Sequence, residues 1–390
     1  MKLRIIINLL PIAVGGGLQV ANEFVRQLSA DTNSDIKWLM IKRNSNQNSL
    51  SICSNVDIIE VEDNLISRMK FELFSYRTVF EKFEPDAVFT LFGTSLYKTK
   101  ALKINGIAYS NLFYPEIDFW QREKMLNKIL KSIIDKYRLY NLKTADGLIF
   151  ETYGLKRKAN RIKMLKGIEL FTVLPSIHNN IYSINKNEII DSKLRDAKNS
   201  YKILFLSGYH TNKNLDRIPQ IVKALKNQYN TDDITFILTI EETNKSKKFI
   251  EIISDIAYKT NIVNIGMVKH EHIGYLYSRI DSCMLLSNLE SFSNNIIESW
   301  ASRTPLIISD YEWSRSICGE SALYVKNDDL DDICIKIIRL KNNVGLQKKL
   351  TEEGQKILKE YPTPNEKYQQ YIKIIKMLVK RRNDELGKGI

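Results

Sequence analysis

A chain of 390 residues is long for one domain, and 44% hydrophobic with 26% charged residues is the composition of an ordinary folded protein. Its 16 glycines and 8 prolines are too few for a collagen-like or low-complexity chain. No stretch approaches the roughly 18 consecutive apolar residues of a membrane-spanning helix. We therefore expect two domains, each with a hydrophobic core of its own.

The formal charge is +13, from 58 Lys and Arg against 45 Asp and Glu. Such an excess favours phosphate-bearing partners, although a chain this rich in Lys, Ile and Asn can owe part of it to codon bias. Scattered cysteines without a C-x-x-C pair suggest free thiols in a reducing compartment, which predicts a cytoplasmic protein. These cysteines are Cys53, Cys283, Cys318 and Cys334.

The basic residues are concentrated in residues 119–167, where thirteen of them stand against four acidic ones. Apolar residues recur at helical spacing in the same segment, namely Phe119, Trp120, Leu126, Ile129, Leu130, Ile133 and Ile134. This pattern is typical of a basic amphipathic helix on an anionic membrane surface, and it predicts peripheral binding to the inner face of the cell membrane. The alternative is an ordinary helix whose apolar side packs in the core.

Short apolar runs with strand character alternate with helical patterns along both halves of the chain. In the first half, strands are expected at 3–9, 36–40, 56–59, 87–91, 106–110 and 147–150, and helices at 18–30, 65–82 and 119–144. In the second half, strands are expected at 202–207, 234–239, 262–265, 282–287, 305–309 and 322–325, and helices near 214–228, 246–258, 271–279, 294–302 and 329–341. This alternation predicts two doubly wound α/β domains with parallel sheets covered on both faces.

The polar, weakly patterned stretch that follows the last strand of the first half predicts a domain boundary. We place the first domain at 1–178 and the second at 179–365. A final helix, 366–390, carries an apolar stripe made of Tyr368, Tyr371, Ile372, Ile375, Leu378 and Val379. Because doubly wound sheets bind ligands at the carboxyl ends of their strands, two facing domains imply a binding cleft.

Three glycines, Gly15, Gly16 and Gly17, follow the first strand and precede the first helix. Glycines there let backbone amides approach a phosphate or a sugar hydroxyl, so Gly16 and Gly17 are candidate ligand contacts. A tight turn without a ligand explains the same residues equally well.

A loop from Gly208 to Asn214 occupies the same place after the first strand of the second half. Lys213, at the mouth of a helix N-terminus, can hold a diphosphate and neutralise charge as that group departs. A lysine on a loop is usually just solvated. The position and neighbours of Lys213 favour the functional interpretation.

The most informative segment runs from Ser287 to Glu298. Its polar loop ends at a helix cap, Ser293 or Asn294, and Glu290 in the loop precedes Glu298 on the helix by eight positions. The loop amides can meet phosphate or sugar oxygens, and a helix carboxylate can accept hydrogen bonds from both hydroxyls of a ribose. Two glutamates at this spacing are common by chance, so the prediction depends on the strand, loop and helix around them.

Metal and nucleophile sites are not expected. The four histidines do not pair at metal-ligand spacing. The D-x-D at Asp329 and Asp331 is better explained as the acidic first turn of a helix, and a G-x-S-x-G elbow is absent.

The second-half motifs, between Lys202 and Val325, resemble those of the retaining glycosyltransferases of family 4, which include enzymes of bacterial polysaccharide and O-antigen synthesis. The resemblance rests on G-x-x-x-x-K-N at 208–214, on Asn264-Ile265-Gly266 and Leu276-Tyr277, and on the E-x7-E segment at 290–310. In the first half it is weaker. It implies a GT-B fold of two Rossmann-like domains, with the final helix crossing back to the first domain.

By this resemblance, Glu298 would bind the ribose of a nucleotide-diphosphate sugar and Lys213 its diphosphate, with backbone near Met267 and Val268 at the base. Lys213 and Glu290 would be the catalytic residues. Further donor contacts would come from Gly16, Gly17, Gly208, Ser291, Phe292, Ser293, Asn294 and Asn295. No metal or cofactor would be required, because a lysine and helix dipoles offset the charge of the leaving diphosphate, and front-side attack would retain the anomeric configuration.

Two departures from the family pattern bear on the site. Tyr209 stands where relatives often have an arginine, so one diphosphate contact is missing or comes from His210. Polar residues around Phe292 leave the donor sugar open, and no acceptor-side base is assigned, because the segment from Tyr109 to Asn111 has no histidine.

The leading interpretation is a metal-independent glycosyltransferase that moves a hexose from a nucleotide-diphosphate sugar to a glycan acceptor. The basic segment suggests that this acceptor is lipid-linked, in cell-surface polysaccharide or lipopolysaccharide biosynthesis. The alternatives are a nucleotide-sugar epimerase of the same fold and a catalytically silent, membrane-associated scaffold. Nucleic acid is not an expected partner, since the basic segment lacks a recognition module.

Overall fold

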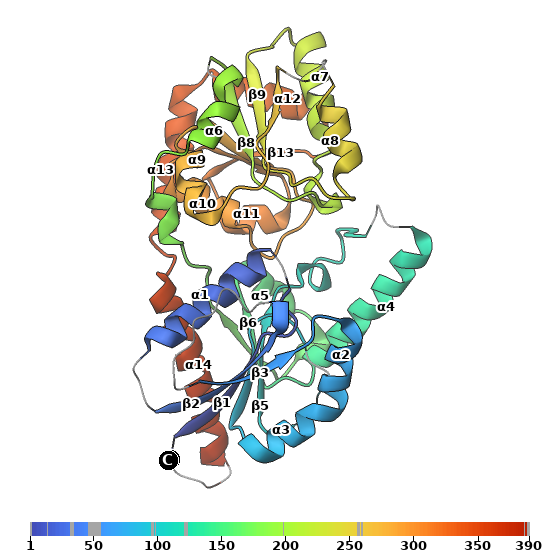
Figure 1. The fold of residues 1–390 in the computed structure, drawn as a ribbon, viewed down its shortest axis with the longest axis vertical. Helices are drawn as coiled ribbons and strands as arrows, with labels where there is room; N and C mark the ends of the chain where they lie inside the picture. The colour runs from blue at the N-terminus through green and yellow to red at the C-terminus, as the bar shows by residue number, and fades with distance from the viewer. Residues whose placement is uncertain are drawn as a thin grey trace. The chain divides into compact units, whose positions relative to one another are not determined.

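The computed structural model describes residues 2–13, 15–31, 35–45, 56–94, 97, 99–120, 124–197, 199–255, 258, 260–385 and 387. The chain forms two compact units, one of Met1–Ser176 with Pro362–Ile390 and one of Ile177–Tyr361. Each unit is built on one parallel sheet with helices packed against it (Figure 1).

The first unit contains a seven-stranded sheet in the order β3-β2-β1-β4-β5-β6-β7. Its strands are β1 (Leu3–Asn8), β2 (Ile36–Arg43), β3 (Val56–Val61), β4 (Ala87–Thr90), β5 (Leu102–Ile107), β6 (Gly147–Phe150) and β7 (Glu169–Thr172). Successive side chains of β1 enter opposite cores, with Ile5 and Ile7 on one face and Ile6 on the other. Both faces are therefore buried, as a doubly wound sheet requires.

The fifth strand was expected at 106–110, and that prediction is wrong. β5 begins four residues earlier, at Leu102, because Lys103 and Asn105 belong to the strand although they are polar. Both are buried, and Lys103 Nζ donates to Thr144 Oγ1 at 2.9 Å. A buried polar residue with a partner interrupts the apolar pattern without ending the strand.

The helices of the first unit are α1 (Gly16–Ala30), α2 (Leu65–Lys70), α3 (Tyr76–Phe83), α4 (Met125–Leu142), α5 (Tyr153–Asn160) and α14 (Pro364–Glu385). A π-helical turn, η2 (Phe71–Ser75), joins α2 to α3, where one helix was expected. The helix expected at 119–144 is α4, which begins at Met125, and residues 121–123 lie outside the described part of the chain.

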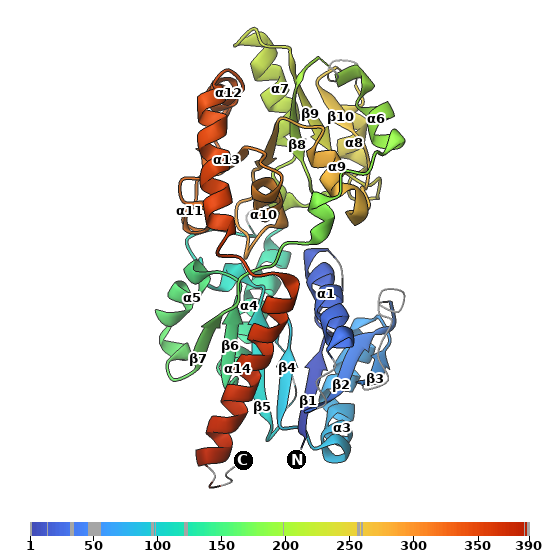
Figure 2. The ribbon, with the colours of Figure 1, turned by 90° about the vertical axis from the view of Figure 1, so that its left-hand side faces the viewer.

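Helix α14 packs on the first unit, as predicted for the final helix. All six residues of its apolar stripe are buried in the core that α1 shares with the sheet. It runs beside β4 and β5 (Figure 2). At Gly147 a Cβ atom would lie 2.9 Å from Leu378 Cδ1, so a glycine in β6 permits this close approach.

The second unit has six parallel strands in the order β10-β9-β8-β11-β12-β13. They are β8 (Tyr201–Phe205), β9 (Ile234–Leu238), β10 (Ile262–Asn264), β11 (Ser282–Leu285), β12 (Leu306–Ser309) and β13 (Ala322–Val325). The helices are α6 (Glu188–Lys193), α7 (Arg217–Asn227), α8 (Lys247–Ile253), α9 (Ile273–Tyr277), α10 (Asn294–Ala301), α11 (Glu312–Cys318), α12 (Leu330–Lys341) and α13 (Val344–Leu358). The two predicted doubly wound parallel-sheet domains are thus confirmed.

The cysteines and the first turn of α12 agree with the sequence predictions where the structure describes them. Cys283, Cys318 and Cys334 are buried free thiols, while Cys53 lies outside the described residues. Asp329 caps α12, its side chain accepting from the Asp332 amide. Among the described helices, none combines the length and the apolar character needed to cross a membrane.

Candidate functional site

The strand order of the second unit reverses between β8 and β11. β8, β9 and β10 follow one another to one side, and β11, β12 and β13 to the other. β8 and β11 are paired in parallel, with Leu204 opposite Cys283, so the loops that follow them start at the same sheet edge. Ligands of doubly wound sheets bind at such a reversal. The two predicted motif loops, 208–214 and 287–293, are the loops at this point.

Asparagine side chains join these two loops. Asn212 Nδ2 donates to Leu289 O at 2.8 Å, and Asn212 Oδ1 accepts from the Leu289 amide at 3.3 Å. The Asn288 amide also donates to Asn212 O at 3.0 Å. Three hydrogen bonds therefore fix the loop after β8 to the loop after β11 at one residue.

Asn214 adds a second, buried connection. Its backbone is left-handed, with φ of 55°, and its Nδ2 donates to Leu286 O and to Asn288 Oδ1, each at 2.7 Å. Asn288 is bonded in turn by Trp313 Nε1, which donates to its carbonyl oxygen at 3.0 Å. We call Asn212, Asn214 and Asn288 the asparagine clasp.

Lys213 lies between two residues of the asparagine clasp and forms an ion pair with Glu290. Lys213 Nζ is 2.5 Å from Glu290 Oε1, and the two side chains are only 18% and 15% exposed. An ion pair this far from solvent requires good geometry, because both charges lose hydration. The asparagine clasp supplies that geometry, so two of the three predicted charged residues are in contact.

Glu298, on α10, is partly buried and has a different partner. The Tyr277 hydroxyl donates to Glu298 Oε2 at 3.3 Å. Burial raises the pKa of Glu298 from 4.5 to about 7, against the opposing effect of the Tyr277 hydrogen bond. A carboxylate that has lost hydration gains most from new hydroxyl donors, which is what a ribose offers.

The start of α10 is tied to the loop after β8. Asn295 Nδ2 donates to Leu206 O at 2.8 Å. Ser293 occupies the N-cap position, as predicted, and its side chain makes no cap hydrogen bond. The Phe292 ring packs on Tyr361 with 5.8 Å between centroids, so this side chain has a packing role. Ser291 and Asn294 are half-buried between these residues.

Neither of the two residues that follow Gly208, Tyr209 and His210, replaces the missing arginine as a cation. The Tyr209 ring stacks on Phe249, and its hydroxyl donates to Asp216 at 2.9 Å. Partial burial, together with the charges of Lys213 and Lys245, lowers the pKa of His210. The imidazole is therefore neutral near pH 7 and offers an N–H donor instead of a positive charge.

The residues expected at the base follow β10. Met267 is exposed and Val268 half-buried, in a loop where Gly266 has φ of 77°. Asn264 fixes this loop to the one after β9, because its Oδ1 accepts from the Ile240 amide at 2.9 Å and its Nδ2 donates to Ile240 O at 3.0 Å.

Gly16 and Gly17 belong to the first unit, at the start of α1. The residue that requires glycine there is Gly15, whose φ is 73°, whereas a Cβ atom at Gly16 would meet no atom within 4 Å. A Cβ atom at Gly17 would make ordinary contacts, the shortest 3.7 Å to Ile12. Backbone geometry alone thus explains Gly15 and leaves room around the other two.

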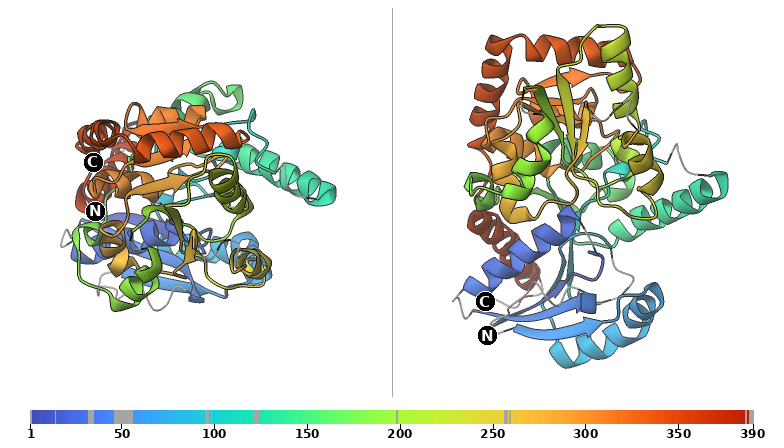
Figure 3. Two further views of the ribbon diagram at one scale, coloured as in Figure 1. Left: turned by 90° about the horizontal axis from the view of Figure 1, so that it is seen from above. Right: turned by 45° about the horizontal axis from the view of Figure 1, so that its top comes forward.

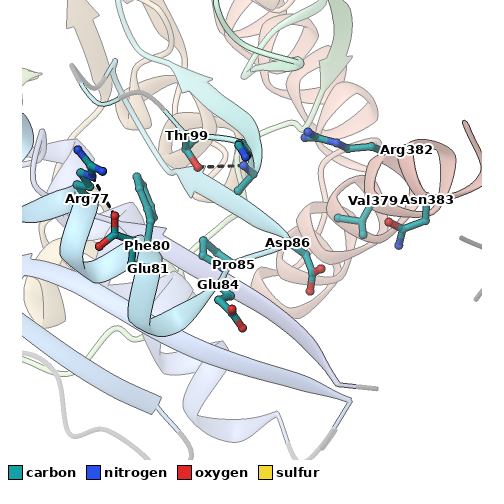
Figure 4. A pocket seen from close by; sticks show the side chains of 12 residues that line it. Arg77, Phe80, Glu81, Glu84, Pro85, Asp86, Thr99, Val379, Arg382 and Asn383 are labelled. Carbon is teal, nitrogen blue, oxygen red and sulfur yellow. Dashed lines mark hydrogen bonds and ion pairs between the residues drawn. The ribbon is translucent and has the colours of Figure 1, made fainter. Parts of the chain in front are cut away.

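The first unit also contains a hollow of about 1060 Å³ (Figure 4). It lies at the amino ends of the strands of the first sheet, where Asp86 precedes β4 and Ala101 precedes β5. Three of its charged lining residues are already in ion pairs, since Arg77 bonds Glu81 at 2.9 Å and Glu84 bonds Arg4 at 3.1 Å. We assign it no ligand. Across the described residues, His, Cys, Asp and Glu form no group of three or more that could hold a metal ion.

The asparagine clasp and the contact of Tyr277 with Glu298 are not predicted from the sequence. Asn212 and Asn214 flank the lysine that was singled out, and Asn288 precedes Glu290 by two positions. The repeated Asn at these motifs was the available signal. Tyr277 belongs to the Leu276-Tyr277 motif, but nothing in the sequence connects it to Glu298.

Most of the second unit matches a known family model. Residues 186–357 match the family model described as Glycosyl transferases group 1. The O-antigen chain mannosyltransferase RfbU of Salmonella typhimurium is 26% identical over 147 residues, which are 38% of this chain and 39% of RfbU. The match thus spans well under half of that relative.

Solved structures of the same architecture match nearly the whole chain. Sucrose-phosphate synthase from Thermosynechococcus elongatus has a TM-score of 0.73 at 14% identity, over 97% of this chain and 99% of its own. Trehalose 6-phosphate synthase from Burkholderia multivorans has a TM-score of 0.74 at 10% identity, over 99% and 98%. HepE from Anabaena, in complex with UDP-glucose, has a TM-score of 0.67 at 10% identity, over 96% and 100%. These likenesses confirm the predicted GT-B fold.

Proposed function

We propose that this chain transfers a hexose from a nucleotide-diphosphate sugar to a glycan acceptor in cell-surface polysaccharide biosynthesis. The observation that carries the proposal is the Lys213–Glu290 ion pair, fixed by the asparagine clasp at the strand reversal of a group 1 glycosyltransferase domain. The likeness to RfbU, an O-antigen chain mannosyltransferase, supports the polysaccharide context. The shared fold of HepE, solved with UDP-glucose, supports a nucleotide-sugar donor.

Lys213 and the N-terminus of α10 supply the positive charge that a bound diphosphate requires. A diphosphate at the sheet edge gives Lys213 a new anionic partner, and the N-terminus of α10 adds the positive end of a helix dipole. As the bond from the sugar C1 to the phosphate oxygen breaks, these groups offset the charge that develops on the leaving group. The same two groups take the role that a divalent cation has elsewhere, so we expect metal-independent transfer.

Glu298 and Glu290 divide the remaining donor contacts in this proposal. Glu298 accepts hydrogen bonds from the ribose hydroxyls, and backbone near Met267 and Val268 contacts the base. Glu290, once Lys213 binds the diphosphate, is free to contact the donor sugar. Gly208 and the 291–295 loop supply amides to phosphate and sugar oxygens.

Retention of configuration follows if the acceptor hydroxyl attacks C1 from the face that the diphosphate leaves. The new bond joins the acceptor oxygen to C1, and the bond from C1 to the phosphate oxygen breaks. The departing phosphate takes the acceptor proton, so no separate base residue is required.

The proposal is tested by a thermal-shift screen of uridine, guanosine and adenosine diphosphate sugars, followed by a transfer assay with the sugar that stabilises the protein. We expect one class to raise the melting temperature and to give sugar transfer that depends strictly on an acceptor glycan, with or without a chelator. Turnover of the sugar without an acceptor would instead identify an epimerase. Donor binding without transfer to any acceptor would support a silent scaffold.

A further inference from the structure

Helix α4 turns its apolar face to solvent. Eight large apolar side chains of this 18-residue helix are at least 39% exposed, whereas its one buried residue is Leu142, at its last position. The eight are Met125, Leu126, Ile129, Leu130, Ile133, Ile134, Tyr137 and Tyr140. At 100° per residue they cover one continuous side of the helix. A globular protein normally buries such a side.

The opposite, polar side of α4 attaches the helix to the first unit. Asp135 Oδ2 accepts from Asn111 Nδ2 at 2.6 Å and from Trp120 Nε1 at 2.8 Å. The Arg138 guanidinium lies 4.3 Å from the centre of the Tyr109 ring. These contacts fix the rotation of α4 about its axis. Because they hold the polar side of α4 against the first unit, the apolar side faces solvent.

This orientation overturns the alternative that the apolar side of the basic segment packs in the core. Figure 3 shows α4 extending away from the sheet of the first unit. Lys128 pairs with Asp118, and Lys131 Nζ lies 4.1 Å from the centre of the Trp120 ring, so these lysines belong to the attachment. Lys124, Lys136 and Lys143 are exposed.

A second apolar stripe lies on the same side of the first unit as α4. The residues Ile66, Met69, Leu73 and Phe74 of α2 and η2 are between 44% and 73% exposed. Helices α2 and α4 both lie on the right of that unit in Figure 1. Two exposed apolar stripes on one side make a surface that is unusual for a water-facing protein.

The charge around α4 selects the partner. Between residues 124 and 143 there are six basic residues and one acidic residue, a net charge of +5. A second copy of the chain would bring the same charge against itself, which disfavours self-association through this face. An anionic bilayer offers an apolar boundary and opposite charge together.

We propose that α4, together with the α2–η2 stripe, binds the surface of an anionic lipid bilayer. The apolar side chains of α4 enter the boundary between headgroups and acyl chains, with the helix axis parallel to the membrane. Lys124, Lys136 and Lys143 meet the lipid phosphates. The further consequence that the acceptor is carried on a lipid rests on the proposed function, whereas membrane binding itself does not.

Vesicle co-sedimentation of the full chain tests this directly. The probes are vesicles of phosphatidylglycerol mixed with phosphatidylcholine, and vesicles of phosphatidylcholine alone. The apolar variant replaces four residues of α4 that are between 51% and 82% exposed, as Leu126→Gln, Ile129→Gln, Leu130→Gln and Ile133→Gln. The matched control replaces exposed apolar residues of the second unit, as Ile252→Gln and Val344→Gln.

We expect the wild type to bind the anionic vesicles and not the neutral ones, and the apolar variant to lose at least about tenfold in binding. The control should bind like the wild type. A charge variant with Lys124→Glu, Lys136→Glu and Lys143→Glu should also bind less, as should the wild type at high salt.

Absence of binding to anionic vesicles, or equal binding by the apolar variant, would overturn the proposal. So would a dimer in light scattering that the apolar variant dissociates, because the face would then serve a second copy. Nucleotide-sugar stabilisation of the apolar variant is measured in parallel. It should remain at the wild-type level, so failure of membrane binding and failure of the proposed function give different results.

Discussion

The Lys213 ammonium lies 2.5 Å from Glu290 Oε1, although the two residues are 77 positions apart in the chain. Each therefore serves as the counter-ion of the other. A diphosphate that binds Lys213 must compete with Glu290 and in doing so releases its carboxylate. The two residues are thus coupled, and their substitutions should not have additive effects on turnover.

In the proposed mechanism, replacing Lys213 by alanine removes the positive charge that offsets the leaving diphosphate. We expect kcat/KM of Lys213→Ala to fall by about a hundredfold or more, as for other lost charge-stabilising groups. Lys223→Ala, at an exposed position of α7, serves as the matched control and should be unchanged. Steady-state kinetics with the donor found in the screen measures both, and wild-type kinetics for Lys213→Ala would remove it from the site.

Glu298→Gln should stabilise the fold at pH 8 while weakening donor binding. Burial raises the pKa of Glu298 to about 7, above its ordinary 4.5, so the folded protein binds this proton more tightly than the unfolded chain does. The free energy of unfolding therefore decreases as pH rises from about 4.5 to about 7. This difference between the two pKa values corresponds to a loss of up to about 3 kcal/mol in the free energy of unfolding. A glutamine side chain carries no charge, so Glu298→Gln avoids this loss.

Melting temperatures across pH provide the measurement for Glu298. Wild type and Glu298→Gln should coincide near pH 4.5 and diverge by several degrees by pH 8, with the variant higher. Donor affinity of the variant should be lower, because an amide accepts hydrogen bonds from a ribose less strongly than a carboxylate does. If the melting temperatures of the two proteins differed by the same amount at every pH, the Glu298 carboxyl would not be buried as described.

The periodic parts of the fold were predictable, and so were the loops that follow β8 and β11. An apolar strand that runs into a polar loop and a capped helix is a local pattern, so 287–298 could be placed without coordinates. β5 was misplaced because periodicity assumes that polar residues face water, whereas Lys103 is buried and bonded to Thr144. A local sequence pattern does not predict hydrogen bonds between residues that are far apart in the chain.

The orientation of α4 and the asparagine clasp could not be predicted for the same reason. Helical spacing shows that α4 has an apolar side, but only its contacts with Asn111 and Trp120 determine where that side points. Asn214 bonds a residue 74 positions away, so its role depends on the pairing of β8 with β11. Tertiary contacts of single side chains decide both features.

Gly208→Ala should separate folding from donor binding. A Cβ atom at Gly208 would lie 3.6 Å from the His210 ring, an ordinary contact, so we expect an unchanged melting temperature. If backbone amides there approach a phosphate, the added methyl group should weaken nucleotide-sugar binding by about tenfold. Gly274→Ala is the opposite case, because its Cβ atom would lie 2.5 Å from Ser183 O and should destabilise the fold. Unchanged donor affinity in Gly208→Ala would exclude close approach of the ligand at this glycine.

Asn214 allows the backbone and side-chain contributions of the asparagine clasp to be measured separately. Asn214→Ala loses both Nδ2 hydrogen bonds and places an alanine at φ of 55°, whereas Asn214→Gly loses the bonds but tolerates that φ. Leu286 O keeps a donor in Asn327 Nδ2 at 2.8 Å, so the bond loss should cost about 1–3 kcal/mol and the left-handed backbone about 1 kcal/mol more. Denaturant unfolding should therefore give the highest free energy of unfolding for the wild type, a lower one for Asn214→Gly and the lowest for Asn214→Ala.

Both Asn214 variants should also lower turnover, because Lys213 loses the neighbour that positions it beside Glu290. Full activity in a well-folded Asn214→Gly would contradict that positioning role.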